Sequence, residues 1–156
     1  MKVLVIGGAG YLGSHVVRKL LNNNHQVRVL DKMDFSSYSL DNISDSENLE
    51  IVEGDMRNIS TVYQCLNDME AVIILAAVVG EPACDSSPEE TVQTNFLAVK
   101  AIADCSIHLG IKRFIFASSI YVLSNQGGFY RTSKKASELY IEEYQRRFNL
   151  KFIKKK

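Results

Sequence analysis

A tyrosine and a lysine near the end of the chain have the spacing of a proton-transfer pair. Tyr130 and Lys134 are four positions apart, so on a helix they lie on the same face, one turn from each other. An ammonium group beside a phenol lowers the phenol pKa from its ordinary value of about 10. We therefore expect Tyr130 to serve as a general base near neutral pH. The alternative is a helix that only exposes a tyrosine and a lysine.

Ser119 completes this group if it lies at the end of a strand. It follows the apolar run Lys112–Ala117, and open α/β sheets bind ligands at the carboxyl ends of their strands. Its hydroxyl could bind a substrate oxygen while Tyr130 takes the proton of the substrate alcohol and a nicotinamide cofactor takes the hydride. Only 11 positions separate Ser119 from Tyr130. We expect the bridge Asn125–Gly128 to be short, with two glycines that make closure feasible.

Three glycines near the N-terminus have the spacing of a phosphate-binding turn. Gly7, Gly10 and Gly13 directly follow the aliphatic run Lys2–Ile6 and open a stretch with helical spacing, which is the context this motif requires. We expect Gly7 to permit the tight turn, Gly10 to let the backbone approach a pyrophosphate, and Gly13 to let the helix pack closely. The N–H groups at the helix N-terminus would then bind the phosphates.

Asp31 fits the other half of a dinucleotide site. It ends the next predicted strand, 18 positions after Gly13, where a carboxylate accepts hydrogen bonds from the adenosine ribose. The same charge repels a 2′-phosphate, so NAD is favoured over NADP, although Lys32 weakens that preference. The alternative is a tight strand–helix turn with a capping aspartate.

Apolar runs alternate with helical patterns along the chain, and this alternation predicts the elements that position these residues. The predicted strands are Lys2–Ile6, Gln26–Asp31, Leu49–Glu53, Ala71–Ala76, Lys112–Ala117 and Leu150–Ile153. The predicted helices are Tyr11–Asn23, Ile59–Leu66, Pro88–His108 and Tyr130–Phe148. The polar stretch Asp34–Ser46 is expected to be a loop or a short irregular helix. This order indicates an α/β fold: a Rossmann doubly wound parallel sheet in three layers, α/β/α, with strand order 3-2-1-4-5-6.

The composition excludes several other classes of protein. The 156 residues include 18 basic and 18 acidic side chains, so no field of one sign indicates a nucleic acid or an anionic membrane as partner. The longest apolar run is too short to span a bilayer. The three cysteines show no metal-ligand pairing, so we expect no metal site and free thiols in a reducing, cytoplasmic compartment.

Several segments in order resemble the motifs of one family. They are Gly7–Gly13, Gly54–Asp55, Leu75–Ala77, Thr94–Leu97, Lys112–Ser119 and Tyr130–Lys134. The chain resembles the extended short-chain dehydrogenase/reductases of the NAD-dependent epimerase/dehydratase type, over almost its whole length. The resemblance implies that Asp55 contacts the adenine amine. It also implies that Ala76 and Ala77 line the cofactor and that Asn95 braces the active site.

The resemblance implies an enzyme that uses NAD to oxidise a nucleotide sugar to a transient ketosugar, which is then re-reduced on its other face or dehydrated. The alternatives are reductive chemistry with the same residues, or a catalytically silent NAD-binding module. The candidate catalytic residues are Ser119, Tyr130 and Lys134. The candidate cofactor-binding residues are Gly7, Gly10, Tyr11, Leu12, Gly13, Asp31, Asp55, Met56, Ala76, Ala77, Asn95, Tyr130 and Lys134.

The chain departs from the family pattern in three ways. The bridge between Ser119 and Tyr130 is short, and Val122–Ser124 replaces the usual Val-Tyr-Gly. The chain also ends after the sixth predicted strand, so residues 1–156 are expected to form one NAD-binding domain without the C-terminal substrate domain. In many members, helices corresponding to 88–108 and 130–148 pair in a homodimer. An apolar stripe for such pairing could be formed by Tyr140, Tyr144 and Phe148, or these side chains could pack on the parent sheet.

Overall fold

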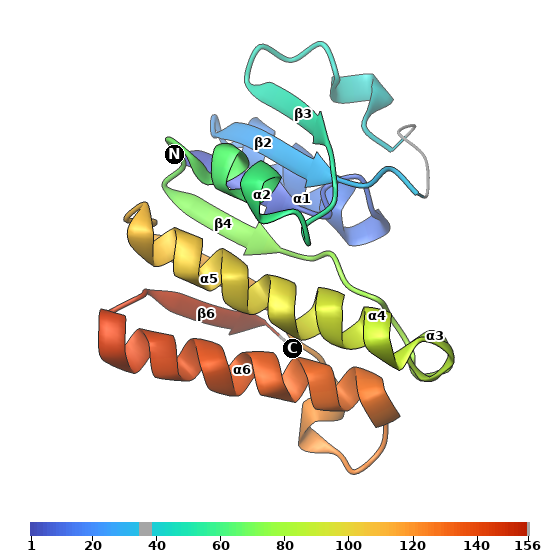
Figure 1. Ribbon diagram of the computed structural model, residues 1–156. Coiled ribbons are helices and arrows are strands. Elements are labelled where there is room, and N and C mark those ends of the chain that lie inside the picture. Colours follow the sequence, from blue (N-terminus) through green and yellow to red (C-terminus); the bar gives the residue numbers. More distant parts are fainter. Residues whose placement is uncertain (35–38, 156) are drawn as a thin grey trace.

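The protein contains one six-stranded parallel sheet with helices on both faces (Figure 1). The computed structural model describes residues 1–34 and 39–155. The strand order is β3-β2-β1-β4-β5-β6, and every neighbouring pair is parallel. The strands are β1 (Lys2–Ile6), β2 (Gln26–Asp31), β3 (Leu49–Glu53), β4 (Ala71–Ile74), β5 (Arg113–Ala117) and β6 (Phe152–Lys155). The predicted Rossmann fold and its strand order are therefore confirmed.

The helices divide between the two faces of this sheet. In Figure 1, α1 lies behind the sheet, whereas α2, α5 and α6 lie in front of it. The helical elements are α1 (Tyr11–Asn22), η1 (Asp41–Ile43), α2 (Ile59–Leu66), α3 (Glu81–Ser86), α4 (Pro88–Val92), η2 (Gln93–Ala98), α5 (Val99–His108), η3 (Ile120–Leu123) and α6 (Gly128–Phe148). No helix in the described ranges is long and apolar enough to cross a membrane.

Two apolar clusters hold these layers together. The α1 face of the sheet contributes Val3, Val5, Val27 and Val29, and Val17 of α1 packs among them. The opposite face contributes Leu4, Ile6, Leu30, Val72, Ile74, Phe114 and Phe116. Because residues of alternating parity are buried on opposite faces, the central strands appear in the sequence as continuous aliphatic runs rather than as alternating patterns.

The last three strands differ from their predicted bounds: β4 ends earlier, β5 begins one residue later, at Arg113, and β6 is shifted by two residues. The fourth strand stops at Ile74, because the N–H groups of Leu75 and Ala76 both donate to the Ile6 carbonyl, at 2.9 and 3.1 Å, and the chain leaves the ladder there. The sixth strand starts at Phe152, since Leu150 is instead buried in the core before the strand begins. In the polar stretch Asp34–Ser46, the short helix η1 fits the expectation, and residues 35–38 lie outside the described residues.

The long helix predicted from Pro88 to His108 contains a wider turn in its middle. Residues Gln93–Ala98 form the π-helix η2 between α4 and α5. The Ser137 hydroxyl of α6 donates to the Asn95 carbonyl at 2.6 Å, which draws this carbonyl toward the neighbouring helix. Such π turns are frequent at functional sites. The helix ends as predicted near His108, and Gly110 follows in the left-handed conformation with φ of 69°.

Candidate cofactor and active site

The predicted site residues gather at the carboxyl edge of the sheet. The glycine turn follows β1, Asp31 ends β2, Asp55 follows β3, and Ser119 follows β5. Tyr130 lies in the first turn of α6, which returns from the same edge (Figure 1). Parallel strands with right-handed crossovers bring these segments to one edge, which is where open α/β sheets bind ligands.

The fold requires glycine at two positions of the turn, Gly7 and Gly13, whereas Gly10 has room for a side chain. Gly7 has φ of 86°, and a Cβ on it would lie 2.5 Å from the Ala76 nitrogen. A Cβ on Gly13 would lie 2.0 Å from the Gly7 carbonyl oxygen. At Gly10 the nearest atom would be 3.5 Å away, and no side chain caps the α1 N-terminus that begins there. The turn therefore fits a pyrophosphate that approaches the backbone at Gly10.

Asp31 holds the glycine turn and the chain that follows β2. Its Oδ2 accepts a hydrogen bond from the Ala9 N–H at 2.9 Å, and its Oδ1 accepts one from the Met33 N–H at 3.0 Å. The capping role considered as an alternative is thus present. Each carboxylate oxygen can accept a second hydrogen bond, so the predicted contact with the ribose hydroxyls is compatible with this geometry and stays a prediction.

Asp55 is tied to a neighbouring arginine. The Arg57 backbone N–H donates to Asp55 Oδ1 at 2.8 Å, and the Arg57 Nε donates to Oδ2 at 2.9 Å. These hydrogen bonds, chiefly those of the guanidinium, hold the pKa of the Asp55 carboxyl below its ordinary value. The side chain of Met56 is buried in the core, so its backbone is the part that could face an adenine. The predicted adenine contact of Asp55 stays a prediction.

Ser119 and Tyr130 meet in spite of the short bridge between them. The Ser119 hydroxyl lies close enough to the Tyr130 phenol to lower the phenol pKa, and it accepts a hydrogen bond from the Tyr121 N–H at 3.3 Å. The Tyr121 ring packs edge-on against the Tyr130 ring, with centroids 6.1 Å apart. A Cβ on Gly127 would lie only 2.9 Å from the Tyr121 ring, so the bridge needs a glycine there. The sequence analysis did not single out Tyr121.

The predicted effect of Lys134 on the tyrosine is wrong for this structure. Burial raises the pKa of the Tyr130 phenol above its ordinary value, and the Ser119 hydrogen bond offsets only part of this effect. Lys134 lies on the same face of α6, but its Nζ donates to the Ala117 carbonyl at 3.0 Å and lies 4.7 Å from the centre of the Phe116 ring. Burial lowers the pKa of Lys134 to about 8. The i, i+4 spacing thus gives a shared face without directing the ammonium to the phenol.

Asn95 joins the segment after β4 to α6. Its Oδ1 accepts from the Val78 N–H at 2.8 Å, and its Nδ2 donates to the Val78 carbonyl at 2.9 Å and to the Ser133 hydroxyl at 3.3 Å. Asn95 is 1% exposed, so its amide positions its neighbours. Ser133 and Ser137 hold it from α6, and sequence reasoning missed both. They lie three and seven positions after Tyr130, a spacing that places them on the same helix face as the tyrosine, and this was the signal that could have identified them.

Cys84 is buried beside Tyr130 and Lys134. The thiol is fully buried in α3 and donates to the Val78 carbonyl at 3.5 Å. It lies close enough to Tyr130 and Lys134 to contribute to the pKa of each. The sequence left open whether Cys84 faces the substrate region or is a plain loop thiol; the structure places it in α3, buried beside the tyrosine and the lysine.

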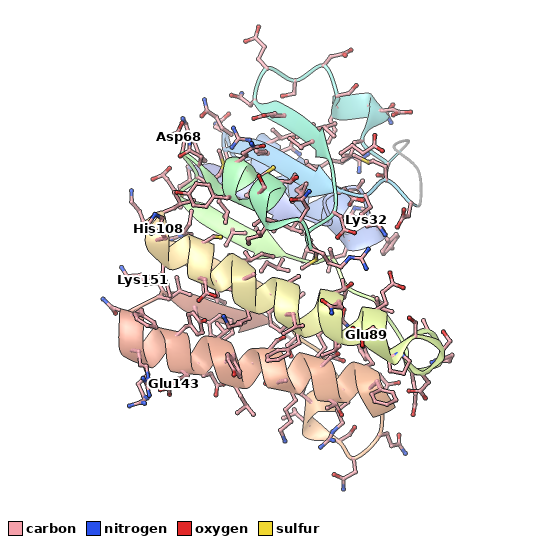
Figure 2. The ribbon with its side chains drawn as sticks, in the orientation of Figure 1. Lys32, Asp68, Glu89, His108, Glu143 and Lys151 are labelled. Atoms are coloured by element: carbon pink, nitrogen blue, oxygen red, sulfur yellow. The ribbon has the colours of Figure 1, made fainter. Side chains whose placement is uncertain are left out.

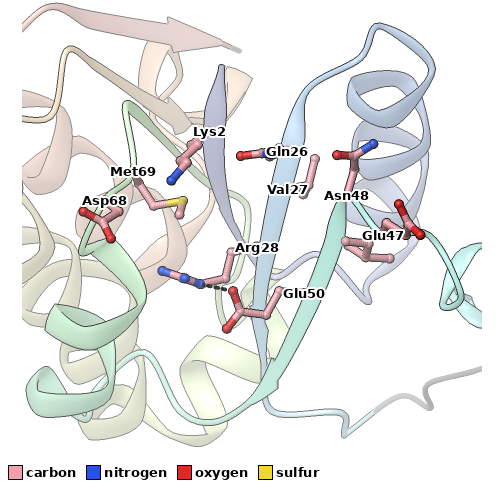
Figure 3. A pocket seen from close by; sticks show the side chains of 10 residues that line it. Lys2, Gln26, Val27, Arg28, Glu47, Asn48, Glu50, Asp68 and Met69 are labelled. Carbon is pink, nitrogen blue, oxygen red and sulfur yellow. Dashed lines mark hydrogen bonds and ion pairs between the residues drawn. The ribbon is translucent and has the colours of Figure 1, made fainter.

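A hollow of about 260 Å³ opens at the opposite, amino edge of the sheet (Figure 3). Lys2, Gln26, Arg28, Glu50 and Met69 are among the residues that line it. The Arg28 guanidinium is already engaged there, by Glu50 at 2.6 Å and by the Cys65 carbonyl at 2.9 Å. This hollow lies away from every predicted site residue, so it is a separate feature of the surface.

A comparison with known protein families supports a cofactor site at the carboxyl edge of the sheet. The NAD dependent epimerase/dehydratase family matches residues 3–154. The chain belongs to this family. A relative from Klebsiella pneumoniae, "UDP-glucose 4-epimerase", is 33% identical over 131 residues, which make up 81% of this chain and 94% of that protein.

Solved structures of epimerases and dehydratases share the fold closely. A dTDP-glucose 4,6-dehydratase from Streptomyces venezuelae with NAD bound has a TM-score of 0.90 and 26% identity, over 99% of this chain and 54% of that one. A UDP-glucose 4-epimerase from Thermotoga maritima with UDP-glucose has a TM-score of 0.87 and 27% identity, over 99% and 54%. The chain thus spans about half the length of these structures. The epimerase/dehydratase family is NAD-dependent.

Proposed function

We propose that residues 1–156 form the NAD-binding domain of an enzyme that epimerises or dehydrates a nucleotide sugar, with Ser119, Tyr130 and Lys134 as its catalytic group. The observation that carries the proposal is the meeting of Ser119 with the buried Tyr130 at the same sheet edge as the Gly10 turn, whose helix N-terminus no side chain caps. Relatives named for UDP-glucose and dTDP-glucose chemistry support the substrate class. All three cysteines are free, which fits a reducing, cytoplasmic location.

The glycine turn and the strand ends would hold NAD in an extended arrangement. The α1 N-terminus at Gly10 would bind the pyrophosphate, and the free acceptor capacity of Asp31 would bind the adenosine ribose. Ala76 and Ala77, which follow β4, would line the path toward Tyr130. NAD held there would supply an acceptor for a hydride from the substrate carbon.

The chain's own residues would handle the substrate proton. Ser119 would orient the substrate oxygen through its hydroxyl. Tyr130 keeps its proton at neutral pH, because its pKa is raised by burial, so in this arrangement its hydroxyl is a proton donor. To accept a proton instead, the phenol needs a lower pKa. The Lys134 ammonium would lower it by leaving its present partner, the Ala117 carbonyl, and moving closer to the phenol. Rotation of the Lys134 side chain would therefore switch Tyr130 between acid and base.

Tyr130→Phe is expected to reduce the rate at which nucleotide sugars are converted by about 100-fold or more, because a positioned acid–base group contributes that much. The rate is followed by chromatography of the epimerised or dehydrated products from a panel of UDP- and dTDP-sugars, because a cycle that returns the hydride leaves no net change in NAD. Tyr140→Phe, an exposed tyrosine on the same helix, is the matched control and should retain the wild-type rate. Equal rates in the two variants would contradict the catalytic role. Tight NAD binding without conversion of any sugar would favour the silent-module alternative.

We also propose a homodimer through the helices of residues 88–108 and 130–148. Large apolar side chains are exposed along them: Val92, Leu97, Phe129, Leu139, Tyr140 and Phe148. A hollow of about 100 Å³ lies between α4 and α6 on this face. Tyr144 instead packs on the core and donates to Asp104, so only part of the predicted stripe faces outward.

Leu139→Glu is expected to shift the chain to a monomer in sedimentation equilibrium, because burying a charge in an apolar interface is costly. Leu12→Glu changes a similarly exposed leucine on α1, which lies on the opposite face of the sheet, and should leave the mass unchanged. A wild-type chain that is monomeric at high concentration would contradict the proposed dimer.

A further inference from the structure

A row of alternating charges borders the adenosine side of the proposed cofactor site. Lys32 Nζ lies 3.0 Å from Asp34 Oδ2, just after β2. Arg57 lies 2.5 Å from Asp55 and 3.5 Å from Glu90 of α4. The row therefore links the ends of β2 and β3 with α4. Figure 2 shows Lys32 at the carboxyl edge of the sheet, the end of the molecule opposite Asp68, His108 and Lys151.

The two ion pairs influence each other. The pKa of the Asp55 carboxyl is lowered mainly by its hydrogen bond from Arg57, with a smaller contribution from Lys32. The pKa of the Arg57 guanidinium is raised mainly by Asp55, and then by Glu90 and Asp34. Both cations of this row therefore already have carboxylate partners.

The turn after β2 places the Lys32–Asp34 pair beside Asp31. Asp31 Oδ1 accepts from the Met33 N–H, and Met33 has φ of 62°, in the left-handed region. This turn sets the direction of the chain immediately after the carboxylate that is expected to bind the ribose. A cation at this position is the group that accommodates the 2′-phosphate of NADP. Lys32 alone would thus oppose the preference that Asp31 creates.

We propose that Asp34 is a cofactor-specificity residue, which neutralises Lys32 and repels a 2′-phosphate, so that the chain rejects NADP although a lysine follows Asp31. The inference rests on the proposed NAD site at the glycine turn. Asp55 and Glu90 act in the same sense on Arg57, the second cation of the row. Selectivity for NAD then comes from paired charges as well as from the single carboxylate of Asp31.

The expected effect is moderate because the pair is exposed. The side chains of Lys32 and Asp34 are 42% and 56% exposed, and exposed ion pairs contribute little. Asp34→Asn should free Lys32 and remove one repulsive charge, and we expect NADP to bind about two- to fivefold more tightly. The affinity for NAD should stay within about twofold. The gain should shrink at high salt, because exposed charges are screened.

The experiment is a calorimetric titration of NAD and NADP into the wild type, Asp34→Asn, Lys32→Met and the double variant. We expect the gain in NADP affinity in Asp34→Asn, and we expect only the smaller part of it, from the removed repulsion, to remain in the double variant. Asp45→Asn removes an exposed carboxylate elsewhere in the same connection between β2 and β3 and controls for net charge.

Three results would overturn the inference: an unchanged NADP affinity in Asp34→Asn, a gain of the same size with and without Lys32, or an equal gain in Asp45→Asn. Each of these leaves NAD binding intact, and therefore leaves the proposed function standing. A wild type that binds neither cofactor would overturn the proposed function together with the inference. The two kinds of failure are therefore distinguishable.

Discussion

Gly13→Ala is expected to lower the free energy of unfolding by about 3 kcal/mol, because overpacking a closed site costs about that much. The added Cβ would lie 2.0 Å from the Gly7 carbonyl oxygen and 2.7 Å from the Gly8 Cα. Both are backbone atoms, so no side-chain rotation can relieve the contact. The turn after β1 would have to open, and α1 would move away from the sheet. Urea denaturation measures the loss.

Gly10→Ala is the matched variant for the same turn. Its backbone is extended, with φ of −70°, and the nearest atom to an added Cβ is 3.5 Å away. We expect the free energy of unfolding to change by less than about 1 kcal/mol, the usual scale of a helix-cap substitution. Equal losses of stability in the two variants would contradict the assignment of Gly13 to packing and Gly10 to the ligand.

Lys134→Met is expected to raise the free energy of unfolding at pH 7 by about 2 kcal/mol. The fall of the Lys134 pKa from 10.5 to about 8 corresponds to about 3 kcal/mol at 1.36 kcal/mol per pH unit. Loss of the hydrogen bond to the Ala117 carbonyl offsets about 1 kcal/mol of this stabilisation. Lys135→Met, an exposed neighbour on the same helix, should change stability by less than about 0.5 kcal/mol.

The advantage of Lys134→Met should depend on pH in a defined direction. Below pH 8 the lysine is protonated in both folded and unfolded chains, and the full cost of burying the charge is present. Between about pH 8 and 10.5 the unfolded chain binds more protons at this site than the folded chain does. The free energy of unfolding of the wild type therefore rises with pH across this range. The difference between variant and wild type should therefore shrink across this window. A constant difference, or a destabilised variant, would contradict the burial of a charged ammonium.

This lysine also illustrates a trade between stability and function. A methionine of similar length would fill the same space without a charge. The wild-type chain keeps an ammonium against the end of β5, next to the tyrosine that it would assist. We expect Lys134→Met to be more stable and less active than the wild type, in the same sugar-conversion assay as Tyr130→Phe.

The sheet and the glycine turn were predictable because their signals are local. A buried parallel strand is a short aliphatic run, and Gly7, Gly10 and Gly13 act within one turn of chain. Strand order followed from the family resemblance and the handedness of crossovers. Even the meeting of Ser119 and Tyr130 could be expected, since two glycines made the bridge closable.

Tertiary contacts decided what the sequence could not predict. The pKa of Tyr130 depends on burial by distant segments, including η3 with Tyr121 and α3 with Cys84. The π turn at Asn95 involves a hydrogen bond from Ser137, 42 positions later in the chain. Arg57 meets Glu90 only because α4 returns to the same sheet edge. Spacing along one helix or strand carries no information on such contacts.

Calorimetric titration of NAD into the wild type and Gly10→Ala tests the central claim, that the turn at Gly7–Gly13 binds NAD through its backbone. The wild type should bind one NAD per chain. Gly10→Ala should bind at least about tenfold more weakly, which corresponds to about 1.4 kcal/mol, while its urea denaturation midpoint stays close to that of the wild type. The absence of binding to the wild type, or equal affinities in both proteins, would contradict the account.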